Sequence, residues 1–359
     1  MSCLHDQAFG DARTSKRIIH CMTHPAPARK QRYQRLTVIA LAIMVVVGVL
    51  IVALDWREVK QLSGSADWRF LILAVGFAAA SYLCASASLV VMLRAFHVRL
   101  NRKYLLRVGM VSNVLENLIA HPVGLSLRLL ALGRHGVSHS QTVGSSVLLA
   151  YFKNLVFYAL VPVSLVYIIF SYPVAFGGVI ALGIVIAVVT VAIIIATIVV
   201  FSARVRVLVL KALARIWRLV TRRDIKQQLA EFELSLTQGI AELRGHSGVR
   251  MPVAGLILGD AAATIVALWF CFAALHVPVH IGVLIAGFTF GVTLTIISFI
   301  PGDLGVQEAS MAGVFALFGV PFSHGVLVAI LFRVVYYFLP FFFSLSLYWA
   351  LLRESNAEA

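Results

Sequence analysis

A stretch of thirty residues without a charged side chain, residues 174–203, limits what this chain can fold into more than any other feature. A helix needs about 20 apolar residues to cross the roughly 30 Å hydrocarbon core of a bilayer. Similar stretches recur, and we expect spans at residues 36–54, 70–93, 142–170, 174–203, 251–275 and 323–352. Charged residues make up 13% of the chain, about half their share in soluble domains. The sequence therefore predicts an all-α fold, a polytopic transmembrane helical bundle.

The net charge of +15 comes from basic residues that lie between the apolar segments. This distribution is typical of the cytoplasmic loops of membrane proteins, and it argues against nucleic acid as a partner. We expect a multi-pass protein of the cytoplasmic (inner) cell membrane with both termini in the cytoplasm. Residues 1–35 are expected to form a disordered basic tail, residues 36–352 the transmembrane domain, and residues 353–359 a C-terminal tail.

Residues 204–250, the largest segment between spans, have the pattern of two amphipathic helices. In the first of them, basic residues recur at the three- and four-residue spacing of one helical face: Lys211, Arg215, Arg218 and Arg222. We expect residues 204–223 to lie on the anionic inner leaflet of the membrane. A purely structural pair of linker helices is the alternative.

Neither metal nor thiol chemistry finds support in the sequence. The four cysteines form no CxxC motif and no metal-ligand spacing, so free thiols are expected. His135 and His139 are four residues apart, but Gly136 favours a loop, and we interpret both histidines as solvated. No metal and no other cofactor is expected.

Residues 301–308, with the sequence PGDLGVQE, interrupt an otherwise apolar region. Pro301 and Gly302 stop a helix, because proline has no amide hydrogen and glycine has no conformational restraint. Inside a bilayer, such a break is tolerated only where protein or a water-filled cavity surrounds it. Asp303 and Glu308 lie in this break, and carboxylates within a membrane usually mark a functional site. A structural role is the alternative, with Asp303 as a helix N-cap and Glu308 in a first helical turn.

A second interrupted segment, residues 108–128, is apolar but carries several polar side chains, and Pro122 and Gly124 break it. We expect it to be a re-entrant segment from the cytoplasmic side, with Arg128 just beyond the break. An interfacial helix followed by a loop is the alternative. The segment broken at Gly302 would enter from the other side, so the two are expected in inverted orientation, as in many transporters. Half-helices that begin after Gly124 and Gly302 would offer amide donors to an anion.

Ionised side chains also occur within the expected spans, where they must pair, reach the interface or line a cavity. They are Lys153, Asp260 and Arg333, and Tyr336 and Tyr337 follow Arg333 at three and four residues, on the same helical face.

An anionic lipid is the ligand implied by the family resemblance given below, and these residues would form the site for its headgroup. Arg128, Lys153 and Arg333 would contact its phosphate, the arginines through paired hydrogen bonds and the lysine as a point charge. Glu308 and Asp260 would balance the cations when no lipid is bound, or would take up a coupling proton.

The motif around Gly305 and Glu308, followed by the sequence GVP at residues 319–321 and then by Arg333, resembles a known group of membrane proteins. It is similar to the lysylphosphatidylglycerol synthase transmembrane region family, also called flippase-like membrane proteins. The resemblance covers roughly residues 36–352. It implies that Gly305 and Glu308 belong to the family's conserved turn.

Three positions depart from the pattern of that family. Asp303 stands where a glycine is common. The earlier element corresponds to Pro122, Gly124 and Arg128, but its acid is missing, since Leu125 and Ser126 occupy that place. The family's later arginine–aspartate pair corresponds to Lys153 and Asn154.

The resemblance implies translocation of an anionic lipid or of a lipid-linked precursor of the polyprenyl-phosphate type. Bifunctional members of the family carry a soluble aminoacyl-transfer domain, and nothing of that size follows residue 352, so we expect no enzymatic activity. Two alternatives stay open. One is a membrane-embedded transferase acting on a lipid-phosphate donor, which would need convergent carboxylates and usually a metal. The other is a scaffold of a lipid- or envelope-synthesis complex that acts through residues 204–250.

Overall fold

The computed structural model describes residues 64, 66–172, 176–221, 226–245, 247–298 and 305–357 of the chain. All regular elements within these ranges are helices, so the predicted all-α fold is confirmed. Several predictions fall outside the described residues, namely those for the basic tail 1–35, the first span 36–54, and Pro301, Gly302 and Asp303.

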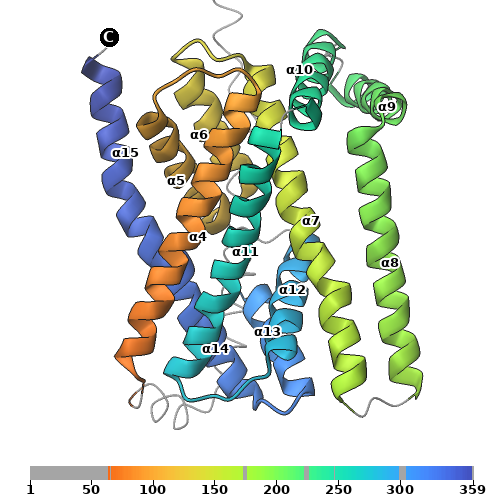
Figure 1. Ribbon diagram of the computed structural model, residues 1–359, viewed down its shortest axis with the longest axis vertical. Helices are drawn as coiled ribbons and strands as arrows, with labels where there is room; N and C mark the ends of the chain where they lie inside the picture. Colours follow the sequence, from red (N-terminus) through yellow and green to blue (C-terminus); the bar gives the residue numbers. More distant parts are fainter. Residues whose placement is uncertain are drawn as a thin grey trace, which may run out of the picture. The chain divides into compact units, whose positions relative to one another are not determined.

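The helices follow one another as shown in Figure 1. They are α4 (Trp68–Ala95), α5 (Arg102–Leu118), α6 (His121–Gly133), α7 (His139–Ser171), α8 (Phe176–Phe201), α9 (Ala203–Thr221), α10 (Lys226–Gly245), α11 (Ser247–Ala274), α12 (Ile281–Ser298), α13 (Val306–Leu317), α14 (Phe322–Arg333), the π-helix η2 (Val334–Phe338) and α15 (Leu339–Ala357).

Five helical stretches among the described residues are long and apolar enough to cross a membrane. They are Trp68–Ala95, His139–Ser171, Leu182–Phe201, Gly248–Ala274 and Phe322–Trp349. The last runs without interruption through α14, η2 and the start of α15. These stretches coincide with the spans expected after residue 70, so the multi-pass membrane architecture is confirmed. The C-terminal helix extends to Ala357, five residues into the segment expected as a tail beginning at residue 353.

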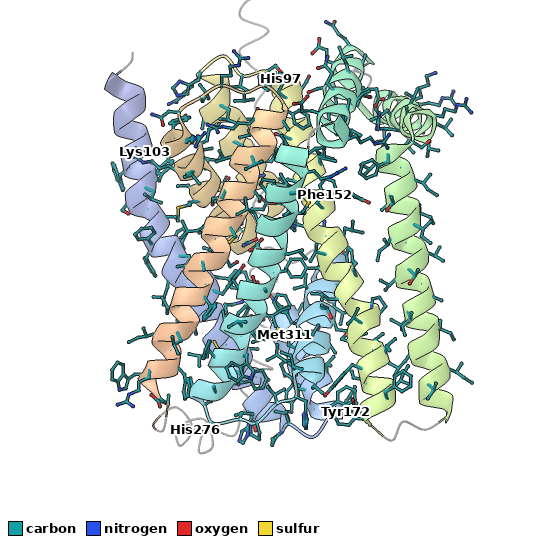
Figure 2. The ribbon with its side chains drawn as sticks, in the orientation of Figure 1. His97, Lys103, Phe152, Tyr172, His276 and Met311 are labelled. Carbon is teal, nitrogen blue, oxygen red and sulfur yellow. The ribbon has the colours of Figure 1, made fainter. Side chains whose placement is uncertain are left out.

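Two helical hairpins enter the bundle from opposite ends. Helices α5 and α6 pack against each other in the half of the bundle where His97 lies (Figures 1 and 2). Helices α12 and α13 pack against each other in the other half, where Met311 and His276 lie. The two hairpins thus lie in opposite halves of the bundle, as the inverted arrangement predicts, although Pro301 and Gly302 of the second break lie outside the described residues.

Burial separates a packed interior from a lipid-facing periphery. The small residues of α4, such as Ala78, Ser81 and Ala85, are buried because α4 packs along α11, as expected for a span rich in small residues. By contrast, Ile184 and Val188 of α8 are 58% and 62% exposed. An exposed apolar face of this extent suits hydrocarbon rather than water.

The two helices predicted within residues 204–250 are present as α9 and α10, near the end of α8 (Figure 1). A buried arginine on α9, Arg206, joins them. Its Nε donates to Glu233 Oε2 at 2.6 Å, and its Nη2 donates to Glu233 Oε1 at 2.8 Å. This two-bond pairing fixes α9 against α10. The contact of residues 204–223 with the inner leaflet stays a prediction.

Candidate functional site

Arg128 lies at the centre of the first hairpin, with its side chain only 5% exposed. Its Nη2 donates to Glu116 Oε2 at 2.6 Å and to Asn113 Oδ1 at 2.8 Å, both on α5. Its Nε donates to Ser112 Oγ at 2.9 Å, and its Nη1 donates to Ser146 Oγ on α7 at 3.3 Å. A buried guanidinium needs this degree of pairing, because an isolated charge in a low-dielectric interior is very costly.

The break that forms this hairpin lies at Ile119 and Ala120, and α6 begins at His121. The expectation that a half-helix starts after Gly124 is therefore wrong, since Gly124 lies inside the first turn, two residues after Pro122. Proline is favourable at the start of a helix, where its missing amide hydrogen would have no partner. Gly124 serves close packing instead of anion binding. A Cβ built on it would lie 2.5 Å from the backbone oxygen of Ser112.

Replacing Gly124 with alanine is expected to destabilise the protein by about 1–3 kcal/mol, because α6 would have to move away from α5. Chemical unfolding in detergent measures this loss. Gly133, at the end of the same helix, is the matched control, because a Cβ there meets nothing within 4 Å. Gly133→Ala should leave stability unchanged or slightly higher. Equal effects of the two substitutions would contradict the packing role of Gly124.

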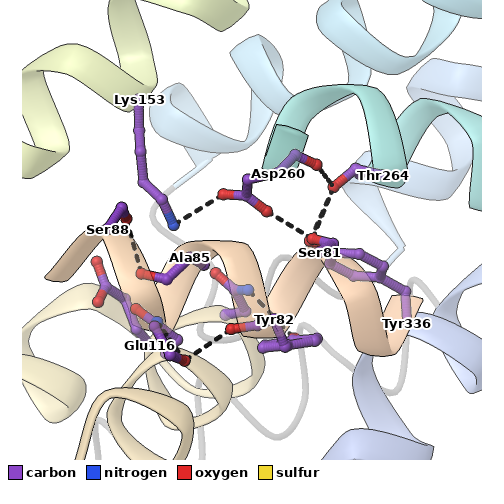
Figure 3. A network of polar contacts seen from close by, with 12 residues as sticks. Ser81, Tyr82, Ala85, Ser88, Glu116, Lys153, Asp260, Thr264 and Tyr336 are labelled. Atoms are coloured by element: carbon purple, nitrogen blue, oxygen red, sulfur yellow. Dashed lines mark hydrogen bonds and ion pairs between the residues drawn. The ribbon is translucent and has the colours of Figure 1, made fainter. Parts of the chain in front are cut away.

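The second charged pair joins α7 to α11. Lys153 Nζ lies 3.1 Å from Asp260 Oδ2, and Figure 3 shows the lysine side chain pointing toward this carboxylate. The other oxygen of Asp260 accepts a hydrogen bond of 2.5 Å from Ser81 Oγ on α4. Ser81 Oγ is also 2.7 Å from the hydroxyl of Tyr336 and 3.0 Å from that of Thr264. The carboxylate thus has both a cation and a hydroxyl network.

The third pair lies at the start of the second hairpin's returning helix, α13. Glu308 forms an ion pair with Arg333 Nε of α14, and both side chains are at least nine-tenths buried. Glu308 Oε2 also accepts a hydrogen bond of 2.8 Å from the amide of Gly305, whose φ of 84° lies in the region that favours glycine. Glu308 thus lies in a first helical turn, as its structural alternative expects, and the same carboxylate also holds the buried arginine.

Gln307 connects Arg333 to the tyrosines of η2. Its Oε1 accepts from Arg333 Nη2 at 3.4 Å and from the Tyr337 hydroxyl at 3.1 Å. The guanidinium carbon of Arg333 also lies 5.3 Å from the centroid of the Tyr337 ring, which is a cation–π contact.

Aromatic rings of α4 and η2 contact one another in the interior of the bundle. Tyr336 lies 5.3 Å from Tyr337 and 5.2 Å from Tyr82 of α4, measured between ring centroids. The hydroxyl of Tyr82 accepts from Asn117 Nδ2 at 3.2 Å, one residue beyond Glu116. Tyr336 and Tyr337 both belong to the π-helix, a local widening that is frequent at functional sites. A series of ring contacts and hydrogen bonds thus links Asn117 of α5 with Gln307 of α13.

Each predicted charged or tyrosine residue in the described part of the chain takes part in an interior contact, and the three cations have three different carboxylates as partners. Arg128, Lys153, Asp260, Glu308, Arg333, Tyr336 and Tyr337 all take part in the contacts above. Two pairings differ from those the resemblance suggested. Glu116 on α5 supplies the acid that seemed to be missing beside Arg128. Lys153 pairs with Asp260, while its neighbour Asn154 is exposed.

Sequence reasoning missed Glu116 as the partner of Arg128, although it lies among the polar residues that marked the segment. Ser112, Asn113 and Glu116 recur at the spacing of one helical face, and this was the available signal. Thr264 carried no such signal, because a threonine hydroxyl in an apolar span commonly bonds to its own helix, as this one does to the carbonyl of Asp260. Tyr82 carried none because a single tyrosine in a span is common in packed interiors.

The predictions about cysteines and histidines concern residues away from this site. Cys84 and Cys271 are free thiols, as expected. His139 is the first residue of α7 and not part of a loop, because Ser138 and Gln141 form a capping box at that point. In the part of the chain that the structure describes, no group of three histidine, cysteine or acidic residues could hold a metal ion.

Spans enclosing two inverted broken hairpins, with ion pairs at both, define a polytopic membrane protein with a charged interior. Residues 38–344 match the family described as the lysylphosphatidylglycerol synthase TM region. Because the match covers most of the chain, the protein belongs to this family. A comparison with curated proteins found no match.

Proposed function

We propose that this protein binds an anionic lipid, or a lipid-linked precursor of the polyprenyl-phosphate type, and translocates it across the membrane. The proposal rests on the combination of family membership and an interior that holds three cations. Charge within a membrane is costly and is retained mostly where it serves a substrate or an ion. A phosphate headgroup is the complementary ligand for arginine and lysine.

The pair of Lys153 and Asp260 is the observation that carries this proposal. The side chain of Lys153 is 25% exposed, whereas that of Asp260 is 6% exposed. The lysine is therefore the partner that a ligand can reach. If Lys153 turned to a phosphate, Asp260 would keep its hydrogen bond from Ser81 and would not be left without a partner. The hydroxyl network thus lowers the free-energy cost that arises when Lys153 leaves the Asp260 carboxylate and binds a phosphate instead.

The two hairpins hold cations in opposite halves of the bundle, and these cations would form a path for the headgroup across the membrane. The Arg128 pair belongs to the hairpin from one end, and the Arg333 pair to the hairpin from the other. A headgroup would pass from one cation to the next, with Lys153 and Asp260 on the adjoining spans. Each carboxylate would retake its cation once the phosphate had moved on, so that no charge stays unpaired.

The basic face of α9 fits the same function. Positive charge beside the membrane attracts anionic lipids at about 1 kcal/mol per basic residue. Residues 204–223 are therefore proposed to gather anionic lipid at the inner leaflet, with the termini of the chain on that side.

Transport of fluorescent lipids in proteoliposomes tests the proposal. Lys153→Met is expected to slow the movement of an anionic lipid at least about tenfold, because a charge-assisted contact contributes roughly 1.5–3 kcal/mol. Lys153→Arg should keep much of the activity. The matched control is Lys103→Met at the start of α5, since Lys103 is exposed and lies outside the site.

Phosphatidylcholine, which carries no net charge, provides the second comparison. It should move no faster with the protein than in protein-free vesicles. Unchanged transport of anionic lipid by Lys153→Met would contradict the assignment of this lysine. Equal transport of both lipids would contradict the proposed selectivity.

A further inference from the structure

A cavity of about 370 Å³ lies among α7, α8, α10 and α11, apart from the three charged pairs. Its lining is apolar except for two arginines, Arg244 and Arg250, and includes Phe152, Phe201 and Ile257. We call it the Arg244–Arg250 pocket. Its volume lies within the range of ligand sites, which are mostly apolar with a few polar groups that orient the ligand.

The two arginines lie at the level where the spans end. Arg250 belongs to the first turn of the span Gly248–Ala274, and Arg244 to the last turn of α10. Phe201, which also lines the pocket, is the last residue of α8. Basic side chains at the end of a span lie near the lipid headgroups, whereas the apolar lining extends from them toward the hydrocarbon.

Both arginines are exposed, and neither forms an ion pair with a residue in the described part of the chain. Arg244 instead lies over the ring of Phe201, 5.5 Å from its centroid. By contrast, the nearby Arg206 is fully engaged by Glu233. The pocket thus combines an apolar interior with two available guanidinium groups at its rim.

The pocket adjoins the pair of Lys153 and Asp260. Phe152 precedes Lys153 directly in α7, and Ile257 lies about one turn before Asp260 in α11. Figure 2 shows Phe152 on the stretch of α7 below α10. A lipid in the pocket would therefore lie next to the one cation of the site that a ligand can reach.

We propose that the Arg244–Arg250 pocket binds an anionic phospholipid from the adjacent leaflet and is the entrance to the site. An acyl chain occupies the apolar cavity, and the phosphate contacts Arg244 and Arg250 through the planar fork that suits it. This inference deepens the proposed function, on which its role as an entrance rests. Binding of the lipid in the pocket is a separate matter that can be measured by itself.

Photo-crosslinking of the full chain in phosphatidylcholine nanodiscs tests this binding. The probe is phosphatidylglycerol with a photoactivatable group on one acyl chain, and mass spectrometry identifies the labelled peptides. We expect labelling in α7 around Phe152 and in α11 around Ile257. The double variant Arg244→Gln/Arg250→Gln should lower this labelling by roughly tenfold, because both charges that attract the phosphate are lost. Labelling by a phosphatidylcholine probe should not change.

Two further variants test whether the labelling depends on the pocket itself. Arg99→Gln is the matched control, since Arg99 is exposed and lines neither the pocket nor the site. It should leave labelling unchanged. Ala254→Trp fills the pocket and should abolish labelling by both probes. Full labelling of the double arginine variant, or labelling outside these helices alone, would overturn the proposal.

The same experiment separates this inference from the proposed function. Lys153→Met should keep the pocket labelling while it loses transport. Loss of anionic-lipid transport in every assay, with the labelling intact, would refute translocation but support the pocket. Transport that depends on Lys153, without labelling of the pocket, would refute the pocket alone.

Discussion

Replacing Arg333 with methionine is expected to destabilise the protein by roughly 3–5 kcal/mol, the usual cost of removing one partner of a buried ion pair. Glu308 would remain in the interior with a side chain only 6% exposed. The amide of Gly305 would still donate to it, but a neutral donor does not replace a guanidinium. Chemical unfolding in detergent measures the loss.

The double variant Arg333→Met/Glu308→Gln separates stability from function. It removes both charges, so most of the lost stability should return, because a buried pair replaced as a whole is often nearly neutral. Glutamine can still accept from the Gly305 amide and keep the helix start intact. If the pair serves lipid transport, this refolded variant should still transport anionic lipid at least about tenfold more slowly. Full transport by the stable double variant would assign the pair a structural role only.

Replacing Glu116 with alanine is expected to cost about 3 kcal/mol, because Arg128 would lose its only carboxylate among the contacts described. The cost lies at the low end of the range for buried pairs for two reasons. Glu116 is itself 18% exposed, and Arg128 would keep hydrogen bonds to Ser112 and Asn113. Chemical unfolding of the variant measures this effect as well.

His121→Gln is the matched control for Glu116→Ala. The ring of His121 lies 2.8 Å from the same carboxylate, but its side chain is 82% exposed. An exposed contact of this kind contributes little, so the substitution should change stability by less than about 0.5 kcal/mol. If Glu116→Ala were as mild as His121→Gln, Arg128 would have another anionic partner, and the assignment of this pair would be wrong.

The sequence by itself determined the spans, the two breaks and the location of the charges, because each depends on local composition. A run of apolar residues must cross the bilayer or be buried, and polar residues together with a proline mark where such a run is interrupted. Arg128, Lys153 and Arg333 lie on the elements that the sequence predicts for them. The interruptions near Pro122 and Pro301, entered from opposite sides of the membrane, also predicted two broken segments in inverted orientation.

Only the tertiary structure decided which charges pair. Glu116 and Arg128 meet because Gly124 lets α6 approach α5, and Lys153 meets Asp260 because α7 packs on α11. The hydroxyls of Ser81 and Tyr336 touch although 255 residues separate them. Such partnerships depend on how helices rotate and pack, and the period of a single helix does not contain that information. The sequence therefore fixes where a charge enters the membrane, and helix packing fixes which group neutralises it.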